Sequence, residues 1–319
     1  YLDINNVKAR YMVHGDMFWD PATGTDAYEF PKGSGMHSGG SASFWIGGYN
    51  QSTQNMHLAG QTYRSRGVDY WPGPLDIQNG SQSDTIIAAK WAQIWKVNRS
   101  AIDSFQVITN HTVANTPKSI LEWPGRQNPH SRTPTNLPLT IPNRSMAPFV
   151  DVNNDNIYNA LDGDFPDIKG DQMLWWIFND NSAFHTASGA NPMKVEIHAS
   201  AYACNQIGIE NTTFLNCKIF NFSSSIYDST LISFWNDVDL GFAFDDYVGF
   251  DSTSRMGIVY NGDSIDETTQ GYGTNLTQRG VVIIKQPGDQ PNYRSPVGSF
   301  VFHNNALAGL GDPDSTHQF

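Results

Sequence analysis

The stretch from Asp151 to Asp171 reads DVNNDNIYNALDGDFPDIKGD, and after Gln172 it passes into the apolar run MLWWIF (173–178). Its first half carries short acidic and amide side chains at alternate positions, which is the arrangement of loops that fold oxygen ligands around a calcium ion. The run MLWWIF has the length and composition of a strand. We therefore expect a β domain with a calcium loop at its edge.

The spacing within this stretch follows the EF-hand order, in which positions 1, 3, 5, 7 and 12 supply the ligands and position 7 uses its carbonyl. Position 6, a glycine in EF-hands, is Asn156 here, and asparagine tolerates the left-handed conformation better than most residues. Position 12 is an aspartate with a shorter reach than glutamate, as in the calcium loops of dockerin modules, which this segment resembles. A solvated Asx-rich turn between strands is the alternative. The expected ligands are Asp151, Asn153, Asp155, the carbonyl of Ile157, and Asp162.

A second acidic segment, NDVDLGFAFDDYVGFD (236–251), follows later in the chain. Its first two aspartates are one residue apart, so they project from the same side of an extended backbone, and Gly241 permits a turn after them. This convergence favours a second cation site, against the alternative of a solvated loop. The expected ligands of this site are Asp237, Asp239, Asp245, Asp246 and Asp251.

The composition is typical of a β-rich extracellular protein, because aromatic residues make up 13% of the chain and charged residues only 16%. The formal net charge of -12 argues against a nucleic-acid partner, since phosphate binding needs clustered basic residues. No apolar run approaches the roughly 20 residues of a membrane span. We expect neither a nucleic-acid partner nor a membrane span.

Periodicity and turn residues predict a mostly-β, antiparallel sandwich-like fold with long loops. One short helix is expected after a capping Asn98, over RSAIDSFQVI (99–108). The proline-rich segment 109–148 is a candidate boundary or interaction arm. It would separate a region 1–148 from a region 149–319, although one continuous domain is also compatible with the pattern. An opening strand is expected within 1–19, ending in the turn 14–16. The other expected strands are 44–49, 56–63, 90–97, 173–178, 194–204, 212–222, 229–235, 256–260, 280–285 and 298–303.

The chain has two cysteines, Cys204 and Cys217, which flank an apparent hairpin. A disulfide between them is possible only if they lie opposite each other, and two free thiols are the alternative.

The chain contains no recognisable catalytic motif. Glu196 and His198 would share one face of a strand, but no matched third ligand for zinc accompanies them. We therefore expect a protein without enzymatic activity. A second hypothesis concerns the loop RSRGVDYWPGPLD (64–76), where exposed Tyr70 and Trp71 would form a platform for stacking sugar rings.

An ordered series of segments resembles large secreted cell-surface proteins of the Bacteroidetes that are exported by the type IX secretion system. The series runs from near Leu2 to about Asp263 and includes LDINNVKARYMVHGDMFWD (2–20), DYWPGPLD (69–76), VEIHASAYAC (195–204) and FWNDVDLGFAFDDYVGFD (234–251). The resemblance implies an outer-surface protein that meets the type IX secretion machinery during export. It also implies a chain that would continue to a C-terminal sorting domain, and it supplies no catalytic residues.

These observations together predict a secreted, calcium-stabilised protein of the cell surface with a structural, adhesive or assembly role. Its expected partners are other surface proteins or glycans, with self-assembly as a further possibility. Two alternatives are a glycan-binding or glycan-degrading extracellular protein and a subunit of an extracellular filament.

Overall fold

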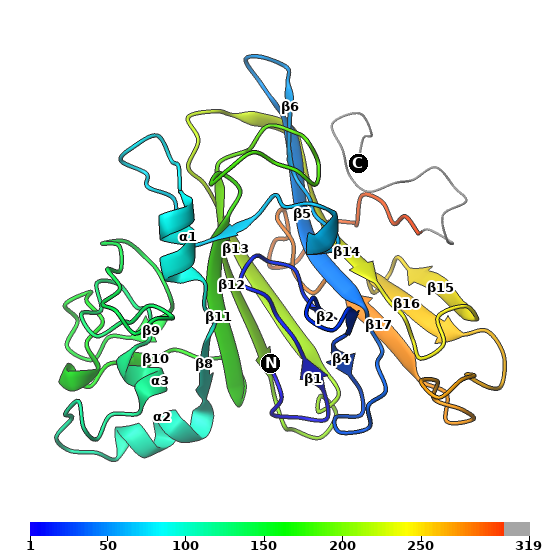
Figure 1. Ribbon diagram of the computed structural model, residues 1–319, viewed down its shortest axis with the longest axis horizontal. Coiled ribbons are helices and arrows are strands. Elements are labelled where there is room, and N and C mark those ends of the chain that lie inside the picture. The colour runs from blue at the N-terminus through cyan, green and yellow to red at the C-terminus, as the bar shows by residue number, and fades with distance from the viewer. Residues whose placement is uncertain (303–319) are drawn as a thin grey trace.

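The computed structural model describes residues 1–302 of the 319-residue chain. The protein is mostly β, and its named strands pair in antiparallel fashion, as expected from the sequence (Figure 1). None of the helices in residues 1–302 has the length and apolar content that crossing a bilayer requires.

The strands are β1 (Lys8–Ala9), β2 (Trp19–Asp20), β3 (Thr25–Asp26), β4 (Tyr28–Glu29), β5 (Ser41–Asn50), β6 (Met56–Ala59), β7 (Trp71–Pro72), β8 (Trp95–Asn98), β9 (Phe149–Val150), β10 (Phe165–Pro166), β11 (Gln172–Asn179), β12 (Val195–Ala203), β13 (Thr213–Asn221), β14 (Tyr227–Asp237), β15 (Asp246–Asp251), β16 (Met256–Asn261) and β17 (Gln278–Val282). The helices are α1 (Thr85–Trp91), α2 (Arg99–Gln106) and α3 (Lys118–Leu121), with 3-10 turns η1 (Arg64–Arg66) and η2 (Ala160–Asp162).

The central sheet has the strand order β13-β12-β11-β7, and β8 also pairs with β11. Every residue of β11 is buried, which explains its uninterrupted apolar sequence: both faces of this strand are covered by protein. Successive side chains of a strand point to opposite faces. Leu174 and Trp176 therefore enter one hydrophobic core, while Met173 and Trp175 enter another.

The first core lies between the central sheet and a second sheet of order β14-β5-β6. Phe44 and Ile46 of β5 meet Trp176 of β11 and Ile197 of β12 in this core, and the N-terminal segment contributes Phe18. Two antiparallel sheets that share a core in this way form a sandwich-like arrangement.

The second core covers the opposite face of the central sheet, where α1 to α3 and the proline-rich segment 109–148 lie, at the left of Figure 1. Trp123 and Ile141 from this segment pack in the same core as Tyr158 and Trp175. Residues on both sides of position 148 thus share one core. The division into regions 1–148 and 149–319 remains a prediction.

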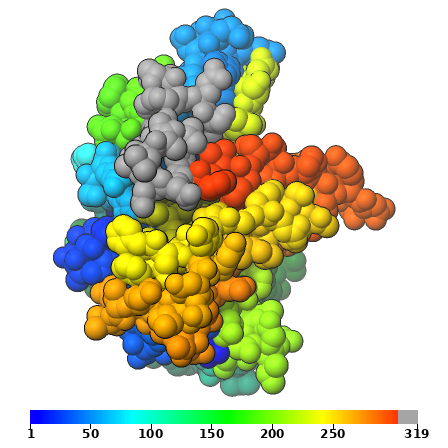
Figure 2. Space-filling view, turned by 90° about the vertical axis from the view of Figure 1, so that its right-hand side faces the viewer, coloured from blue at the N-terminus to red at the C-terminus, as the bar shows by residue number. Residues whose placement is uncertain are grey.

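A third, three-stranded sheet of order β15-β16-β17 follows at the lower right of Figure 1. One of its faces packs through Val259 against Leu240 and Tyr272, and Phe30 and Met36 from the N-terminal part add to this small cluster. The yellow and orange segments that build this sheet cover much of the face in Figure 2.

The helical content differs from the expectation of one short helix. The expected strand 90–97 begins only at Trp95, because α1 occupies the residues up to Trp91. Asp84 starts this helix: its carboxylate accepts a hydrogen bond from the amide of Ile87 at 2.7 Å. The helix after Asn98 is present, but the Asn98 side chain does not cap it and accepts instead from Nε2 of Gln172.

Several strand boundaries also differ. The opening strand expected before the turn 14–16 is limited to β1, Lys8–Ala9. The strand expected over 56–63 ends at Ala59, and the one expected over 280–285 runs from Gln278 to Val282. Residues 298–302 form no strand, and His303 lies outside the described residues.

Both cysteines are free. In the ladder between β12 and β13, Cys217 is paired with Ala199, whereas Cys204 follows the last paired residue, Ala203. The two side chains are therefore not opposite each other, and the sequence alternative of a cross-strand disulfide is not realised.

Candidate functional site

The turn from Asp151 to Asp162 is closed by its own acidic side chains. The carboxylate of Asp151 accepts hydrogen bonds from the amides of Asn154, Asp155 and Asn156, at 2.7 to 3.3 Å. The carboxylate of Asp155 accepts from the amide of Ile157 at 2.7 Å. These bonds hold the first half of the turn in a closed conformation.

Two asparagines carry the backbone through this turn. Asn154 and Asn156 have φ angles of 63° and 62°, so both occupy the left-handed region. Asn156 therefore does what the position 6 glycine does in an EF-hand, as the sequence suggested. Asp162 lies in η2, and its carboxylate accepts from Nδ2 of Asn159 at 2.7 Å.

Asp164 ties the two ends of this turn together, a role that the sequence did not reveal. Its side chain is fully buried and accepts from the amides of Val152 and Asn159, at 2.8 and 2.9 Å. Burial raises the pKa of Asp164, and the nearby charges of Asp151 and Asp155 add to this increase, against the lowering effect of the two amide hydrogen bonds.

The second acidic segment does not form one cluster. Asp246 and Asp251 are the first and last residues of β15, which places them roughly 16 Å apart at about 3.3 Å per residue. Asp251 instead closes the turn between β15 and β16, where its carboxylate accepts from the amide of Thr253 and the hydroxyl of Ser254. The expectation that Asp251 shares a site with the other four aspartates is therefore wrong.

Asp245 and Asp246 lie at the start of β15, near Asp239 and Asp266. Asp245 accepts from Nδ2 of Asn261 at 2.6 Å, and Asp246 accepts from the amide of Leu240 at 2.9 Å. Burial raises the pKa of Asp246 to about 7, and the charges of Asp245, Asp266 and Asp239 contribute to the increase.

Asp237 and Asp239 also lie near Asp26, a residue more than 200 positions earlier in the chain. Burial raises the pKa of Asp26 to about 7, with further contributions from the charges of Asp239 and Asp237. Burial and the charge of Asp239 raise the pKa of Asp237 to about 6. Burial also raises the pKa of Asp239. No local sequence signal points to Asp26, because its proximity depends on how the β2–β3 hairpin packs.

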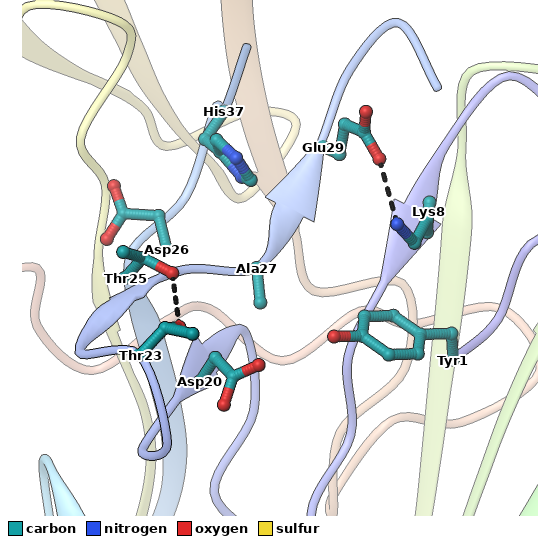
Figure 3. Close-up of a pocket in the computed structure, with 9 residues that line it drawn as sticks. All are labelled: Tyr1, Lys8, Asp20, Thr23, Thr25, Asp26, Ala27, Glu29 and His37. Carbon is teal, nitrogen blue, oxygen red and sulfur yellow. Dashed lines mark hydrogen bonds and ion pairs between the residues drawn. The ribbon is translucent and has the colours of Figure 1, made fainter. Parts of the chain in front are cut away.

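Asp26 also borders a polar cavity of about 220 Å³ on the N-terminal hairpins. Figure 3 shows Asp26 at one end of the cavity with its carboxylate turned away from Tyr1, while the ion pair of Lys8 and Glu29 lies on the other side. His37 lines the same cavity, and burial lowers its pKa. The cavity is therefore bounded by charged and hydrogen-bonding groups.

The proposed sugar platform is not supported at Tyr70. This side chain is 0% exposed, and its hydroxyl donates to the carbonyl of Ala59 at 3.1 Å. Its neighbour Asp69 is also fully buried and accepts from the amide of Gly60 at 3.0 Å. Trp71 is partly exposed but belongs to β7, where it pairs with Asn179. The expectation of an exposed Tyr70 is wrong, because the loop folds inward to fill the first core.

Glu196 and His198 do share one face of β12, as expected. Nε2 of His198 lies 2.8 Å from Oε1 of Glu196, and the third partner is the guanidinium of Arg144, which forms a bidentate ion pair with Glu196. This is a buried ion-pair network and not a set of metal ligands.

Within residues 1–302, no group of three His, Cys, Asp or Glu side chains is already arranged to hold a metal ion. Comparison of the chain with protein-family models, with curated proteins and with solved structures found no match. The fold and the site geometry thus define a mostly-β protein with acidic turns.

Proposed function

We propose that this chain is a calcium-stabilised structural module of a secreted cell-surface protein, with an adhesive or assembly role. The observation that carries this proposal is the conformation of the Asp151–Asp162 turn. Two features of an EF-hand loop support it: Asn156 occupies the left-handed region at position 6, and the carboxylate of Asp151 accepts amides of the turn. Asp151, Asn153, Asp155, the carbonyl of Ile157 and Asp162 would be the ligands.

The composition and the resemblance to type IX secretion substrates support the extracellular part of the proposal. In this setting the partners would be the secretion machinery during export, and other surface proteins or glycans afterwards. Calcium would stabilise the folded state and take no part in a chemical reaction. An ion that binds the folded state and not the unfolded state stabilises the fold by mass action.

We expect calcium to raise the melting temperature of the protein and EGTA to reverse the increase. At a free calcium concentration of 100 times Kd, the stabilisation is about 2.7 kcal/mol, which corresponds to several degrees for a chain of this size. Differential scanning fluorimetry with calcium, magnesium or EGTA measures the shift, and elemental analysis of the purified protein measures bound calcium.

The variant Asp155→Asn should lower calcium affinity at this turn, because it removes a ligand charge while it preserves the size of the side chain. Asp103→Asn, on the exposed face of α2, is the matched control. A melting temperature that does not respond to EGTA, together with the absence of bound metal, would contradict the proposal.

A further inference from the structure

Three carboxylates from separate parts of the chain converge beside Gly40. Asp26 comes from β3, Asp237 ends β14, and Asp239 lies in the connection from β14 to β15. A Cβ atom placed on Gly40 would lie 3.0 Å from Oδ1 of Asp26 and 2.9 Å from Oδ2 of Asp239. Asp237 is adjacent, because its carbonyl accepts from the amide of Gly40 at 3.1 Å.

The missing side chain of Gly40 leaves a small space between two carboxylate oxygens. Calcium binds oxygen ligands at about 2.3–2.6 Å, so a point about 3 Å from both oxygens is close to where an ion held by both would sit. A methyl group at position 40 would occupy this same point.

A buried hydroxyl points to the same site. Ser41 is directly paired with Asp237 in the ladder between β5 and β14, so the two side chains project from the same face of the sheet, roughly 5 Å apart at Cβ. Ser41 is 0% exposed, and among residues 1–302 its Oγ has no hydrogen-bond partner. A buried polar atom without a hydrogen-bond partner needs an explanation. A bound ion with the Ser41 hydroxyl as one of its ligands would provide it.

The negative charge of the three carboxylates is only partly balanced by the protein. The positive charge of Arg279 lowers the pKa of Asp26. The same guanidinium also lies over the rings of Tyr28 and Phe18, at 4.0 and 5.0 Å from their centroids, and donates a hydrogen bond to the carbonyl of Ser38. Tyr63 donates its hydroxyl to Asp237 and contributes no charge. The raised pKa values of Asp26 and Asp237 reflect burial together with this mutual repulsion.

We propose that Asp26, Asp237 and Asp239, with the hydroxyl of Ser41, bind one calcium ion in the space beside Gly40. The ligands are hard oxygens with irregular geometry, which suits calcium better than magnesium. Among residues 1–302 no three carboxylates are arranged around one point, so binding requires the Asp237 side chain to turn from Tyr63 toward the oxygens of Asp26 and Asp239. The ion would fasten the N-terminal β2–β3 hairpin to the end of β14.

This site is separate from the Asp151 turn and shares with the proposed function only the identity of the ion. Its neighbours allow a luminescence signal. Tyr63 donates its hydroxyl to Asp237, and its ring lies 5.0 Å from Trp19 and 5.7 Å from Trp235. Terbium bound here should therefore luminesce when these rings are excited.

Calcium stoichiometry by isothermal titration calorimetry, with terbium luminescence as the second readout, tests the proposal. The variants are Asp26→Asn, which removes a ligand charge, and Gly40→Ala, which fills the space. Asp251→Asn is the matched control, because Asp251 belongs to the same acidic segment but lies at the far end of β15. Asp155→Asn reports on the Asp151 turn.

We expect Asp26→Asn and Gly40→Ala each to lose one equivalent of calcium and the part of the terbium signal that comes from this site. Asp251→Asn and Asp155→Asn should retain the calcium equivalent and the terbium signal of this site. Asp26→Asn should also melt at a higher temperature than the unmodified protein in EGTA, since it relieves repulsion, and this increase separates a lost ligand from a misfolded variant.

Unchanged calcium stoichiometry in both Asp26→Asn and Gly40→Ala would overturn the proposal. So would a protein whose only calcium equivalent disappears in Asp155→Asn, an outcome that leaves the proposed function in place. If Asp155→Asn has no effect while Asp26→Asn and Gly40→Ala each lose an equivalent, this second site stands and the Asp151 turn does not bind calcium.

Discussion

At the scale of single residues, Arg144 of the proline-rich segment forms an ion pair with the central sheet. It pairs with Glu196, which is fully buried on β12, and Nη2 of the arginine lies 2.6 Å from Oε2 of the carboxylate. Burial alone would raise the pKa of Glu196, but the hydrogen bonds from Arg144 and His198 hold it below its usual value. The ion pair therefore holds the proline-rich segment against the central sheet, and each of the two charges has a partner of opposite sign.

We expect Arg144→Ala to lower the free energy of unfolding by about 3–5 kcal/mol, because it leaves the buried charge of Glu196 without its main partner. Urea denaturation followed by circular dichroism measures the change. Lys118→Ala is the control, since Lys118 forms an exposed pair with Glu122 at 3.7 Å and such pairs contribute less than about 1 kcal/mol. Equal effects of the two substitutions would contradict the assignment.

At the scale of elements, α1 shows why local sequence was misread. The residues that it contains, TIIAAKW, lead into WKVN, and the apolar residues of the two elements form one nearly continuous pattern. The helix start depends on a single side chain, Asp84, and the helix then packs Trp91 into the second core. A short helix of this kind is maintained by its cap and by packing more than by intrinsic preference.

We expect Asp84→Ala to lower the free energy of unfolding by about 1 kcal/mol, because it removes the acceptor for the amide of Ile87. The shift in the denaturation midpoint measures it. Asp103→Ala, at an exposed position of α2 that caps no helix, should produce a smaller change. If the two variants are equally stable, Asp84 does not set the start of α1.

At the scale of the whole molecule, the second core joins parts of the chain that the sequence suggested separating. Trp123 of the proline-rich segment and Trp175 of β11 lie with their ring centroids 6.4 Å apart. Trp123 is fully buried, and its indole nitrogen donates to the carbonyl of Pro148 at 2.9 Å. A long loop with buried aromatic side chains is part of the core and not a free linker.

We expect the segment 109–148 and the central sheet to unfold in one transition, because they share this core. Trp123→Ala and Trp175→Ala should each cost about 3–5 kcal/mol and move the same calorimetric peak. Two peaks, of which Trp123→Ala moves only one and Trp175→Ala only the other, would show instead that the two sides of position 148 unfold independently.

The sequence by itself determined the features that depend on neighbouring residues. Periodicity of two and a fully apolar run predict strands such as β11 and β12, and the spacing of short polar side chains predicts the course of the Asp151 turn, because turn geometry is set by local hydrogen bonds and by residues that accept positive φ. The class of fold followed from the same local patterns.

Only the tertiary structure decided which distant residues meet. It buried Tyr70, separated Asp251 from Asp246, brought Asp26 to Asp239 and placed Arg144 on Glu196. Each of these outcomes depends on how sheets and loops pack against one another. That packing is determined by the shape and burial of the whole chain, and the spacing of residues along the sequence does not encode it.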